Sequence, residues 1–232
     1  IFPHHENEIA QSEAFSGKPF VKHWLHSEHL LVDHKKMSKS LGNFYTLRDL
    51  LEKGYTGPEV RYLLLTAHYR MQLNFTMEGL DAARSSLERL SDFALRLQKV
   101  EGRDDSDIDS ILTKTRESFQ TALADDLNIS PALAALFEMV RKVNQLCDDN
   151  RIGKDGAEKA LAFMREIDAV LGFIPFERED LDVPKELLDA LRKREEARKE
   201  KNWAEADKQR DLITSSGYFI EDTPSGPRLK KK

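Results

Sequence analysis

The amino-acid sequence predicts a mainly α-helical fold with three parts: a mixed first part, an antiparallel four-helix bundle and a small α+β domain. Residues 1–75 mix helical and extended signals, whereas residues 76–176 contain apolar stripes at helical spacing. Residues 177–232 begin with a charged helical stretch and end in two short apolar runs around a turn rich in proline and glycine. We expect these three ranges to be domains.

Composition restricts the protein to a few broad classes. The 232 residues suffice for one large domain or for two to three small ones. The sequence has no run near the ~18 apolar residues of a membrane span, and its start lacks the basic-then-apolar order of a secretion signal. Cys147 is the only cysteine, which excludes an internal disulfide and indicates a reducing cytoplasm. The net charge of −5 argues against indiscriminate coating of nucleic acid but is compatible with a local basic face.

The first part is expected to contain three helices and one extended segment. A helix over residues 4–15 is followed by an extended segment over residues 21–32. Thr46 and Asp49 resemble a capping box at the start of a short helix, with aspartate in place of the usual glutamate. A Gly-Pro pair at residues 57–58 starts the third helix, because proline fits the first helical turn.

The bundle is predicted from four apolar stripes that follow one another along the chain. Each stripe has the 3-4 spacing of a helix with one buried face, and they cover residues 80–97, 108–119, 133–143 and 160–171. Ser130 and Pro131 are a suitable N-cap and first-turn pair for the third of these helices. The breaks between the helices are short, which favours antiparallel neighbours. Cys147 is expected to be a buried thiol of this bundle.

The last part is predicted to be two helices and a hairpin. A charged helix over residues 183–201 precedes a second helix over residues 203–216, which Asn202 caps. Residues 218–220 and 228–229 form the two strands of the hairpin.

Two side chains near the start of the chain have the spacing of a metal-ligand pair. On a helix, His4 and Glu8 project from the same face one turn apart, so that their nitrogen and oxygen donors can share one tetrahedral zinc ion. The alternative is a simple surface ion pair between histidine and glutamate, and these two residues alone favour that interpretation. Two ligands do not complete a zinc site, and Cys147 lies in the predicted bundle. If the pair binds a metal, we expect the other ligands upstream of Ile1.

A lysine-rich pentapeptide, Lys36-Met37-Ser38-Lys39-Ser40, follows the extended segment and is here called the lysine loop. Two flexible ammonium groups with small hydroxyl side chains between them can close over a polyphosphate and stabilise the charge of a leaving pyrophosphate. Most lysine-rich loops are merely solvated, so the loop alone leaves both interpretations open.

Together, three segments resemble the cysteinyl-tRNA synthetases, a family of class I aminoacyl-tRNA synthetases. They are FPHHENEIAQS at residues 2–12, Trp24, and KMSKSLGN at residues 36–43. The resemblance continues through RYLL at 61–64, HYR at 68–70, DDLN at 125–128 and the last domain, and it covers essentially the whole chain. It implies that the first part is the remnant of a class I α/β catalytic domain, and that the chain corresponds to the C-terminal half of such an enzyme, without its N-terminal Rossmann portion.

The resemblance implies the reaction of a cysteine-tRNA ligase. ATP, with magnesium, would activate cysteine to cysteinyl-adenylate, and the acyl group would then pass to tRNA(Cys). We expect this chain alone to be inactive, and the enzyme to be a cytoplasmic monomer that does not bind membranes. Two rival functions remain: a cysteine ligase of mycothiol synthesis, which shares the zinc site and the lysine loop but has no anticodon domain, and a tRNA-binding module without catalysis.

The resemblance also assigns roles to individual residues. His4 and Glu8 would be two of the four ligands of one zinc ion that binds the substrate thiolate, with two cysteine ligands outside this chain. Lys36 and Lys39 would be catalytic and stabilise the ATP phosphates. Met37, Ser38 and Ser40 would complete the nucleotide-binding loop. Trp24 would form a wall of the cysteine pocket, although a core aromatic remains an open alternative.

For the last domain, the resemblance implies recognition of the tRNA anticodon by Arg198, Trp203, Asp207 and Asp222. A tryptophan ring can stack on an unpaired base, arginine can bond base edges or phosphate, and aspartate can accept from base amino groups. The alternative interpretation is a helix-packing tryptophan among ordinary exposed charges.

Overall fold

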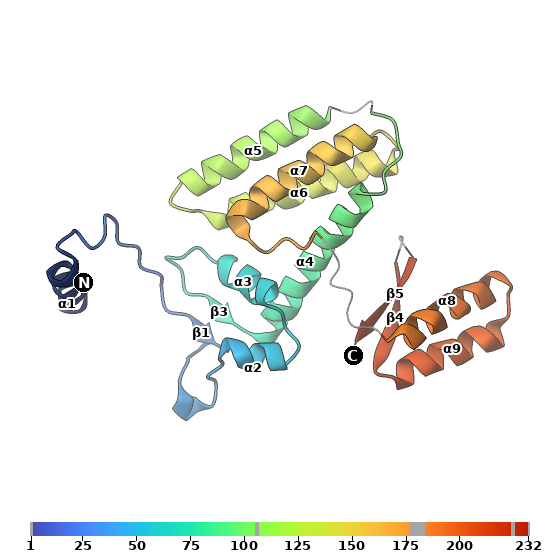
Figure 1. Cartoon of the computed structure of the whole chain (residues 1–232), viewed down its shortest axis with the longest axis horizontal. Helices are drawn as coiled ribbons and strands as arrows, with labels where there is room; N and C mark the ends of the chain where they lie inside the picture. The colour runs from blue at the N-terminus through green and yellow to red at the C-terminus, as the bar shows by residue number, and fades with distance from the viewer. Residues whose placement is uncertain (1, 105–106, 177–183, 224–225, 232) are drawn as a thin grey trace. The chain divides into compact units, whose positions relative to one another are not determined.

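The structure, a computed structural model, describes residues 2–104, 107–176, 184–223 and 226–231 (Figure 1). These residues are mainly helical, in helices α1 to α9 with five short strands, which confirms the predicted fold class. The chain divides into two compact units, one of Ile1–Ser86 with Asp109–Arg141 and one of Leu87–Ile108 with Lys142–Lys232. None of the helices within the described ranges is both long and apolar enough to cross a membrane.

The first unit begins with helix α1, His4–Ser16, which ends where Gly17 takes a left-handed conformation with φ of 64°. The expected extended segment follows, but only its last two residues form a strand, β1 at Leu31–Val32. This strand pairs antiparallel with β2, Lys35–Lys36, and parallel with β3, Asn74–Phe75. The rest of the segment, residues 21–30, forms no strand, although the Glu28 N–H donates to the backbone carbonyl of Tyr69 at 2.7 Å.

Two short helices follow, α2 at Leu47–Glu52 and α3 at Gly57–Leu65, and each begins with a capping box. The predicted box of Thr46 and Asp49 is confirmed, because each side chain accepts a hydrogen bond from the other residue's backbone N–H. The second box, Thr56 with Glu59, was not predicted, although its Thr-x-x-Glu spacing is the usual sequence signal. The start of α3 at the Gly-Pro pair is confirmed.

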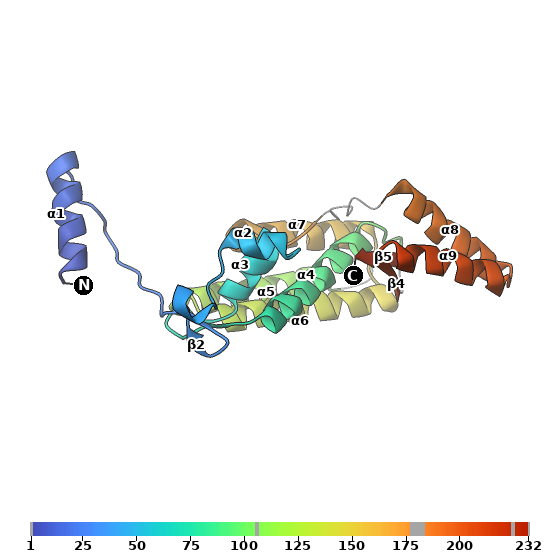
Figure 2. The ribbon, with the colours of Figure 1, turned by 90° about the horizontal axis from the view of Figure 1, so that it is seen from below.

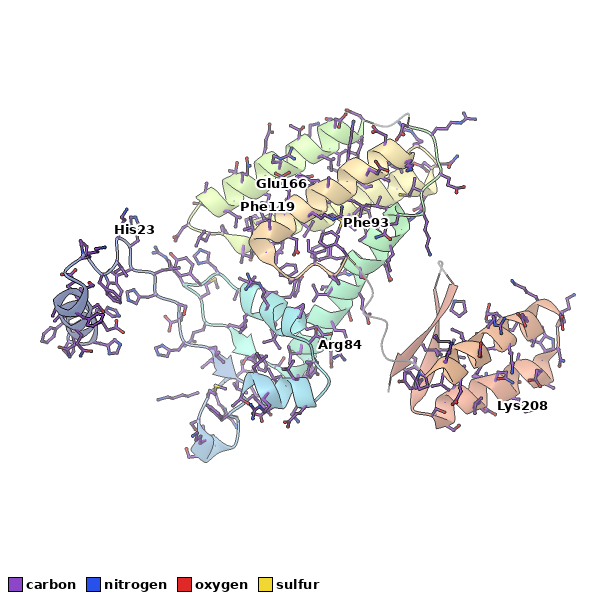
Figure 3. All side chains as sticks on the ribbon, viewed as in Figure 1. His23, Arg84, Phe93, Phe119, Glu166 and Lys208 are labelled. Atoms are coloured by element: carbon purple, nitrogen blue, oxygen red, sulfur yellow. The ribbon has the colours of Figure 1, made fainter. Side chains whose placement is uncertain are left out.

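A buried ion pair joins α3 to helix α4, Met77–Leu97. The Glu59 side chain is 9% exposed, and its Oε1 lies 2.7 Å from Arg84 Nε. Arg84, labelled on α4 in Figure 3, also donates to the carbonyl of Gly54 at 2.7 Å, in the turn between α2 and α3. Its guanidinium lies over the Tyr55 ring, 4.7 Å from the centroid. Arg84 therefore ties the α2–α3 turn to α4.

The four predicted stripes all fall within helices: α4, α5 at Ile108–Ala124, α6 at Ile129–Asp148 and α7 at Lys154–Leu171. Their apolar residues are buried, including Leu80, Leu90, Leu97, Leu112, Phe119, Leu133, Val143, Ala160, Met164 and Leu171. The predicted cap at Ser130 is wrong, because α6 already begins at Ile129. Pro131 still lies in the first turn, where no intrahelical partner for its nitrogen is needed. Cys147 is only partly buried, and this burial raises the pKa of its thiol.

In the second unit, the carboxylate of Asp104 caps the start of α7 from outside the helix. Its Oδ1 accepts hydrogen bonds from the backbone N–H of Gly153 at 2.9 Å and of Gly156 at 3.1 Å. These glycines are required by the close approach, because a Cβ added at either would lie within 2.9 Å of an Asp104 oxygen. The Gly153 hydrogen bond is the main cause that lowers the pKa of Asp104 below its ordinary value.

This cap predicts a specific dependence of stability on acid. Because the folded pKa of Asp104 lies below the unfolded value of about 3.9, its contribution is fully present above that value and is lost as the pH falls through the folded pKa. We expect Asp104→Asn to lower the urea midpoint at pH 7 and to flatten the decline of that midpoint below about pH 4. The test is the urea midpoint measured from pH 2 to pH 7, with Asp107→Asn, at an exposed aspartate, as the control. If the midpoints of the two variants depend on pH in the same way, the prediction is contradicted.

The C-terminal domain is built from α8, Lys185–Lys199, α9, Trp203–Ser215, and a hairpin of β4, Tyr218–Thr223, and β5, Gly226–Lys231. The two helices lie side by side (Figure 2), and the strands pair antiparallel as predicted. The Asn202 cap is confirmed, since its side chain accepts from the backbone of Glu205. A small core holds the domain together, made of Leu187, Ala190, Ile213, Tyr218 and Leu229. The predicted start of its first helix at residue 183 lies outside the described residues.

Candidate functional site

The lysine loop is a structured turn. After β1, Asp33 and His34 both take left-handed conformations, with φ of 50° and 61°, and reverse the chain into β2. The loop then leaves β2 and enters a 3-10 helix at Lys39–Leu41, which ends where Gly42 is left-handed. Ser38 caps this helix, because its Oγ accepts from the backbone N–H of Leu41 at 3.3 Å.

The side chain of Asn43 holds the loop from inside. Its Oδ1 accepts from the backbone N–H of Ser38 at 2.9 Å, and its Nδ2 donates to the carbonyl of Lys36 at 3.1 Å. One amide thus connects the first and the middle residue of the lysine loop. Asn43 belongs to the KMSKSLGN segment, but its spacing from Lys36 gives no sign of these contacts.

A second amide, from Asn74 on β3, holds the turn that leads into the loop. Asn74 Oδ1 accepts from the backbone N–H of His34 at 2.7 Å, and its Nδ2 lies 3.1 Å from His34 Nε2. These bonds fix a left-handed residue without glycine's conformational freedom. This contact between residues 40 positions apart was not predicted.

Both predicted catalytic lysines, Lys36 and Lys39, are exposed, and Ser40 beside them is exposed too. Met37 and Ser38, which belong to the same loop, are half-buried. Lys39 Nζ lies 5.6 Å from the centre of the Phe44 ring, and in the described ranges neither lysine forms an ion pair with a carboxylate. The loop therefore presents two uncompensated ammonium groups on a backbone fixed by two amides, an arrangement that can bind phosphate oxygens.

The donor pair on α1 has a geometry compatible with zinc. His4 Nε2 and Glu8 Oε1 lie 3.3 Å apart, on side chains that are 77% and 43% exposed. Zinc bonds of about 2.0–2.1 Å at a tetrahedral angle put neighbouring donor atoms about 3.3–3.4 Å apart. A plain ion pair fits the same distance, so the geometry admits both interpretations. Within the described ranges no three potential ligands come together, so these residues supply two donors at most.

Trp24 contacts His5, the residue after His4, and is not a core residue, since 42% of it is exposed. Its ring stacks on His5, with centroids 4.5 Å apart, and lies parallel to the ring of His26 at 6.4 Å. The Nε2 atoms of His5 and His26 are 3.3 Å apart. The sequence alone assigned no role to either histidine, and their contact with Trp24 was not predicted, although a spacing of two places residues 24 and 26 on the same side of an extended segment.

In the C-terminal domain, three of the predicted anticodon residues line one notch between α8 and α9. Arg198, Trp203 and Asp207 line it together with Arg194, Ala206 and Arg210. Trp203 is 60% exposed, so the ring is available for stacking and is not a packing anchor. The side chain of Asp222, on β4, lies outside the described residues.

Two arginines of this notch were missed by the sequence analysis. Arg194 lies one helical turn before Arg198, and Arg210 one turn after Asp207, with which it forms an ion pair of 3.2 Å. The i, i+4 and i, i+3 spacings were visible in the sequence and are the signal that could have found them. The notch combines an exposed aromatic face with cationic side chains, which suits an unpaired nucleotide.

Comparison with known proteins identifies two domain families in the chain. Residues 1–85 match the tRNA synthetases class I (C) catalytic domain, and residues 118–175 match the DALR domain. The chain is 54% identical to the cysteine–tRNA ligase of Protochlamydia amoebophila (strain UWE25), over 100% of this chain and 49% of that protein. It is also 54% identical to the cysteine–tRNA ligase of Chlamydia muridarum (strain MoPn / Nigg), over 100% of this chain and 50% of that protein. The chain therefore spans about half the length of these curated relatives.

Solved structures that share the fold include a class I synthetase complex. It is the LeuRS of Agrobacterium radiobacter K84 agnB2 in a ternary complex with tRNA and LeuAMS, with a TM-score of 0.51 over 73% of this chain and 23% of that one. Because the two chains are only 19% identical, this similarity shows the fold and carries no information on function.

Proposed function

We propose that this chain, which belongs to the cysteine–tRNA ligase family of class I tRNA synthetases, supplies the lysine loop, two zinc ligands and the tRNA-binding domains of a cysteine–tRNA ligase. The observation that carries the proposal is the 54% identity to such ligases over the whole chain. Residues 1–75 would be the end of the catalytic domain, residues 76–176 the helical tRNA-binding domain and residues 177–232 the anticodon domain.

In this proposal the lysine loop acts when cysteine is activated. A carboxylate oxygen of cysteine attacks the α-phosphorus of ATP, the bond from that phosphorus to the bridging oxygen breaks, and pyrophosphate leaves. The ammonium groups of Lys36 and Lys39 would stabilise the charge that develops on the leaving group. Ser38 and Ser40 would line the phosphate side, and the backbone around Met37 would lie near the adenine. Asn43 and Asn74 support this role because they hold the loop in place before the reaction, so little reorganisation is needed.

His4 and Glu8 would hold zinc together with two ligands from residues outside this chain. When bound, the ion supplies a soft Lewis-acid site that favours a thiolate over the hydroxyl of serine. Trp24, stacked on His5 beside the pair, would form a wall of the cysteine pocket. The nitrogen-oxygen donor set and the 3.3 Å separation support this role.

The zinc proposal is tested by His4→Ala in a full-length ligase that contains this sequence. Loss of a ligand is expected to lower zinc affinity at least about tenfold and to raise the KM for cysteine more than the KM for ATP. Zinc content measured by mass spectrometry and cysteine-dependent ATP–pyrophosphate exchange provide the two readouts. His23→Ala, at an exposed histidine on the segment after α1, is the matched control. Unchanged zinc content in His4→Ala would remove this residue from the ligands.

The anticodon proposal is tested by Trp203→Ala. Loss of one base-stacking surface worth about 1–3 kcal/mol is expected to raise the KM for tRNA(Cys) roughly 5- to 150-fold. Cysteine-dependent ATP–pyrophosphate exchange, which needs no tRNA, should stay unchanged. Leu212→Ala removes another exposed apolar side chain from α9 and is the control. Equal losses in aminoacylation and in exchange would contradict the proposal.

The remaining elements of the proposal follow from the chemistry. ATP would enter with magnesium, which commonly accompanies nucleotide phosphates. A single thiol suits a reducing cytoplasm, where the ligase would act as a monomer.

A further inference from the structure

Two sequence segments that the proposed function leaves without a role meet in the structure. They are His68-Tyr69-Arg70, after α3, and the turn between α5 and α6 that contains Asp126. We propose that Asp126 is a positioning residue, which anchors the backbone platform of the lysine loop to the α5–α6 turn. This inference rests on the proposed function for its effect on catalysis, but its structural core does not.

Three consecutive side chains converge on Asp126. Tyr69 Oη donates to Asp126 Oδ1 at 2.6 Å, and Arg70 Nε lies 2.9 Å from Oδ2. His68 Nε2 lies 2.8 Å from the backbone carbonyl oxygen of Asp126. Tyr69 and Arg70 also contact each other, with Arg70 Nε donating to the phenol oxygen at 2.9 Å. One residue thus receives three side chains from a segment more than 50 positions away.

The backbone of the segment sets the orientation of the His68 ring. The N–H of Arg70 donates to His68 Nδ1 at 3.3 Å, so this ring nitrogen is the acceptor. The proton of the neutral ring is then on Nε2, which donates to the Asp126 carbonyl. His68 is largely buried and stacks on Tyr69 with centroids 4.7 Å apart. The contacts therefore form one connected network.

The Asp126 backbone is itself unusual. Asp126 and Leu127 both have positive φ, 52° and 57°, so two consecutive residues with side chains lie in the left-handed region. Such conformations are disfavoured for residues other than glycine and persist where surrounding contacts over-determine them. The network of three side chains is such a constraint.

The segment held by Asp126 continues into the support of the lysine loop. Residues 69–75, here called the platform, accept backbone hydrogen bonds from the segment that enters the loop: Glu28 N–H to Tyr69 O at 2.7 Å, Leu31 N–H to Leu73 O at 2.8 Å, and Asp33 N–H to Phe75 O at 3.2 Å. The platform also contains Asn74, which fixes His34. Two residues after His34 the lysine loop begins. A displacement of the platform would therefore displace the loop.

Hydrogen exchange on this 232-residue chain tests the structural core of the inference. In Asp126→Ala, the amides of Glu28, Leu31 and Asp33 should exchange about tenfold faster, because their acceptors lie on a loosened platform. Asp125→Ala removes a neighbouring exposed carboxylate from the same turn and should leave these amides as in the wild type. Faster exchange confined to the α5–α6 turn in Asp126→Ala would overturn the inference, and no catalytic activity is needed to see it.

Kinetics of the full-length ligase test the catalytic part. Asp126→Ala is expected to lower kcat of cysteine-dependent ATP–pyrophosphate exchange about 10- to 100-fold, with the KM for cysteine within about twofold of wild type. Asp126→Asn keeps a side-chain acceptor for Tyr69, which Asp126→Ala lacks, and both variants keep the backbone carbonyl that His68 contacts. Asp126→Asn should therefore recover part of the loss in kcat, whereas general destabilisation would lower the amount of active enzyme in both variants. An unchanged kcat, or an equal change in KM, would overturn the catalytic part.

Two further variants keep the test decisive if Asp126→Ala does not fold. Tyr69→Phe removes the hydrogen bond from the phenol to Asp126, and Arg70→Met removes the ion pair with Asp126; each also removes the bond between Tyr69 and Arg70. Each should speed exchange at Glu28 to a smaller extent than Asp126→Ala does. Exchange at Glu28 as in the wild type in both variants would overturn the inference. If the wild-type ligase showed no cysteine-dependent ATP–pyrophosphate exchange, the proposed function would be refuted. The hydrogen-exchange result on this chain would still decide whether Asp126 anchors the platform.

Discussion

Lys39→Ala in a full-length ligase that contains this sequence is expected to slow cysteine-dependent ATP–pyrophosphate exchange by about 10²–10³-fold. Lys39 lies at the start of the 3-10 helix, capped by Ser38, with its ammonium group over the Phe44 ring and exposed to solvent. The pre-set backbone means that the charge meets the leaving phosphates without rearrangement of the loop. Because the charge on those phosphates develops in the transition state, kcat should fall more than the affinity for ATP.

The matched control is Lys35→Ala, at an exposed lysine on β2 just outside the lysine loop. It changes the local charge by the same amount and leaves the loop intact, so exchange should fall less than about threefold, as for a screened surface charge. Similar losses in the two variants would show that the effect comes from net charge and not from the position of Lys39. Exchange rates at saturating ATP separate the effect on kcat from that on binding.

The second large effect is expected on stability. Glu59→Ala should lower the free energy of unfolding of the first unit by about 3 kcal/mol, the lower end of the range for breaking a buried ion pair. It leaves Arg84 without its carboxylate and removes the acceptor for the backbone N–H of Thr56, which Glu59 binds at 2.7 Å. The lower end applies because the Arg84 side chain is 38% exposed and can reach water. Urea unfolding followed by circular dichroism measures the change.

Two further variants test whether the loss of stability in Glu59→Ala comes from leaving Arg84 unpaired. Glu52→Ala, at an exposed glutamate on α2, should change stability by less than about 0.5 kcal/mol. The double variant with Glu59→Leu and Arg84→Met removes both charges, and it should be more stable than Glu59→Ala because no unpaired ion is left. A double variant less stable than the single one would contradict this account of the pair.

The elements that could be predicted are those set by local sequence. The Thr46–Asp49 box, the Asn202 cap and the start of α3 depend on residues within three positions of each other, and all are confirmed. The buried stripes of α4 to α7 depend on periodicity along one helix. The predicted cap at Ser130 failed because α6 begins one residue earlier, at Ile129, directly after a turn in which Asp126 and Leu127 are left-handed.

For the candidate site, the sequence predicts only the reactive groups, and these stay predictions. The resemblance named Lys36, Lys39, His4 and Glu8, but the residues that support them come from distant positions. Asn74 reaches His34 across 40 residues, and Asp126 reaches Tyr69 across 57. Such contacts have no periodicity and no fixed spacing, and they follow from tertiary packing alone.

Helix α1 carries the donor pair but buries none of its side chains. A helix of 13 residues with no buried side chain in the described part of the chain is only marginally stable in water, so its helical and unwound forms differ little in free energy. His4 and Glu8 face the same ligand only in the helical form. In the proposed zinc site, ligation and helix formation would therefore be one coupled equilibrium, and a surface that packs on α1 would raise the affinity of the pair for zinc without touching either donor.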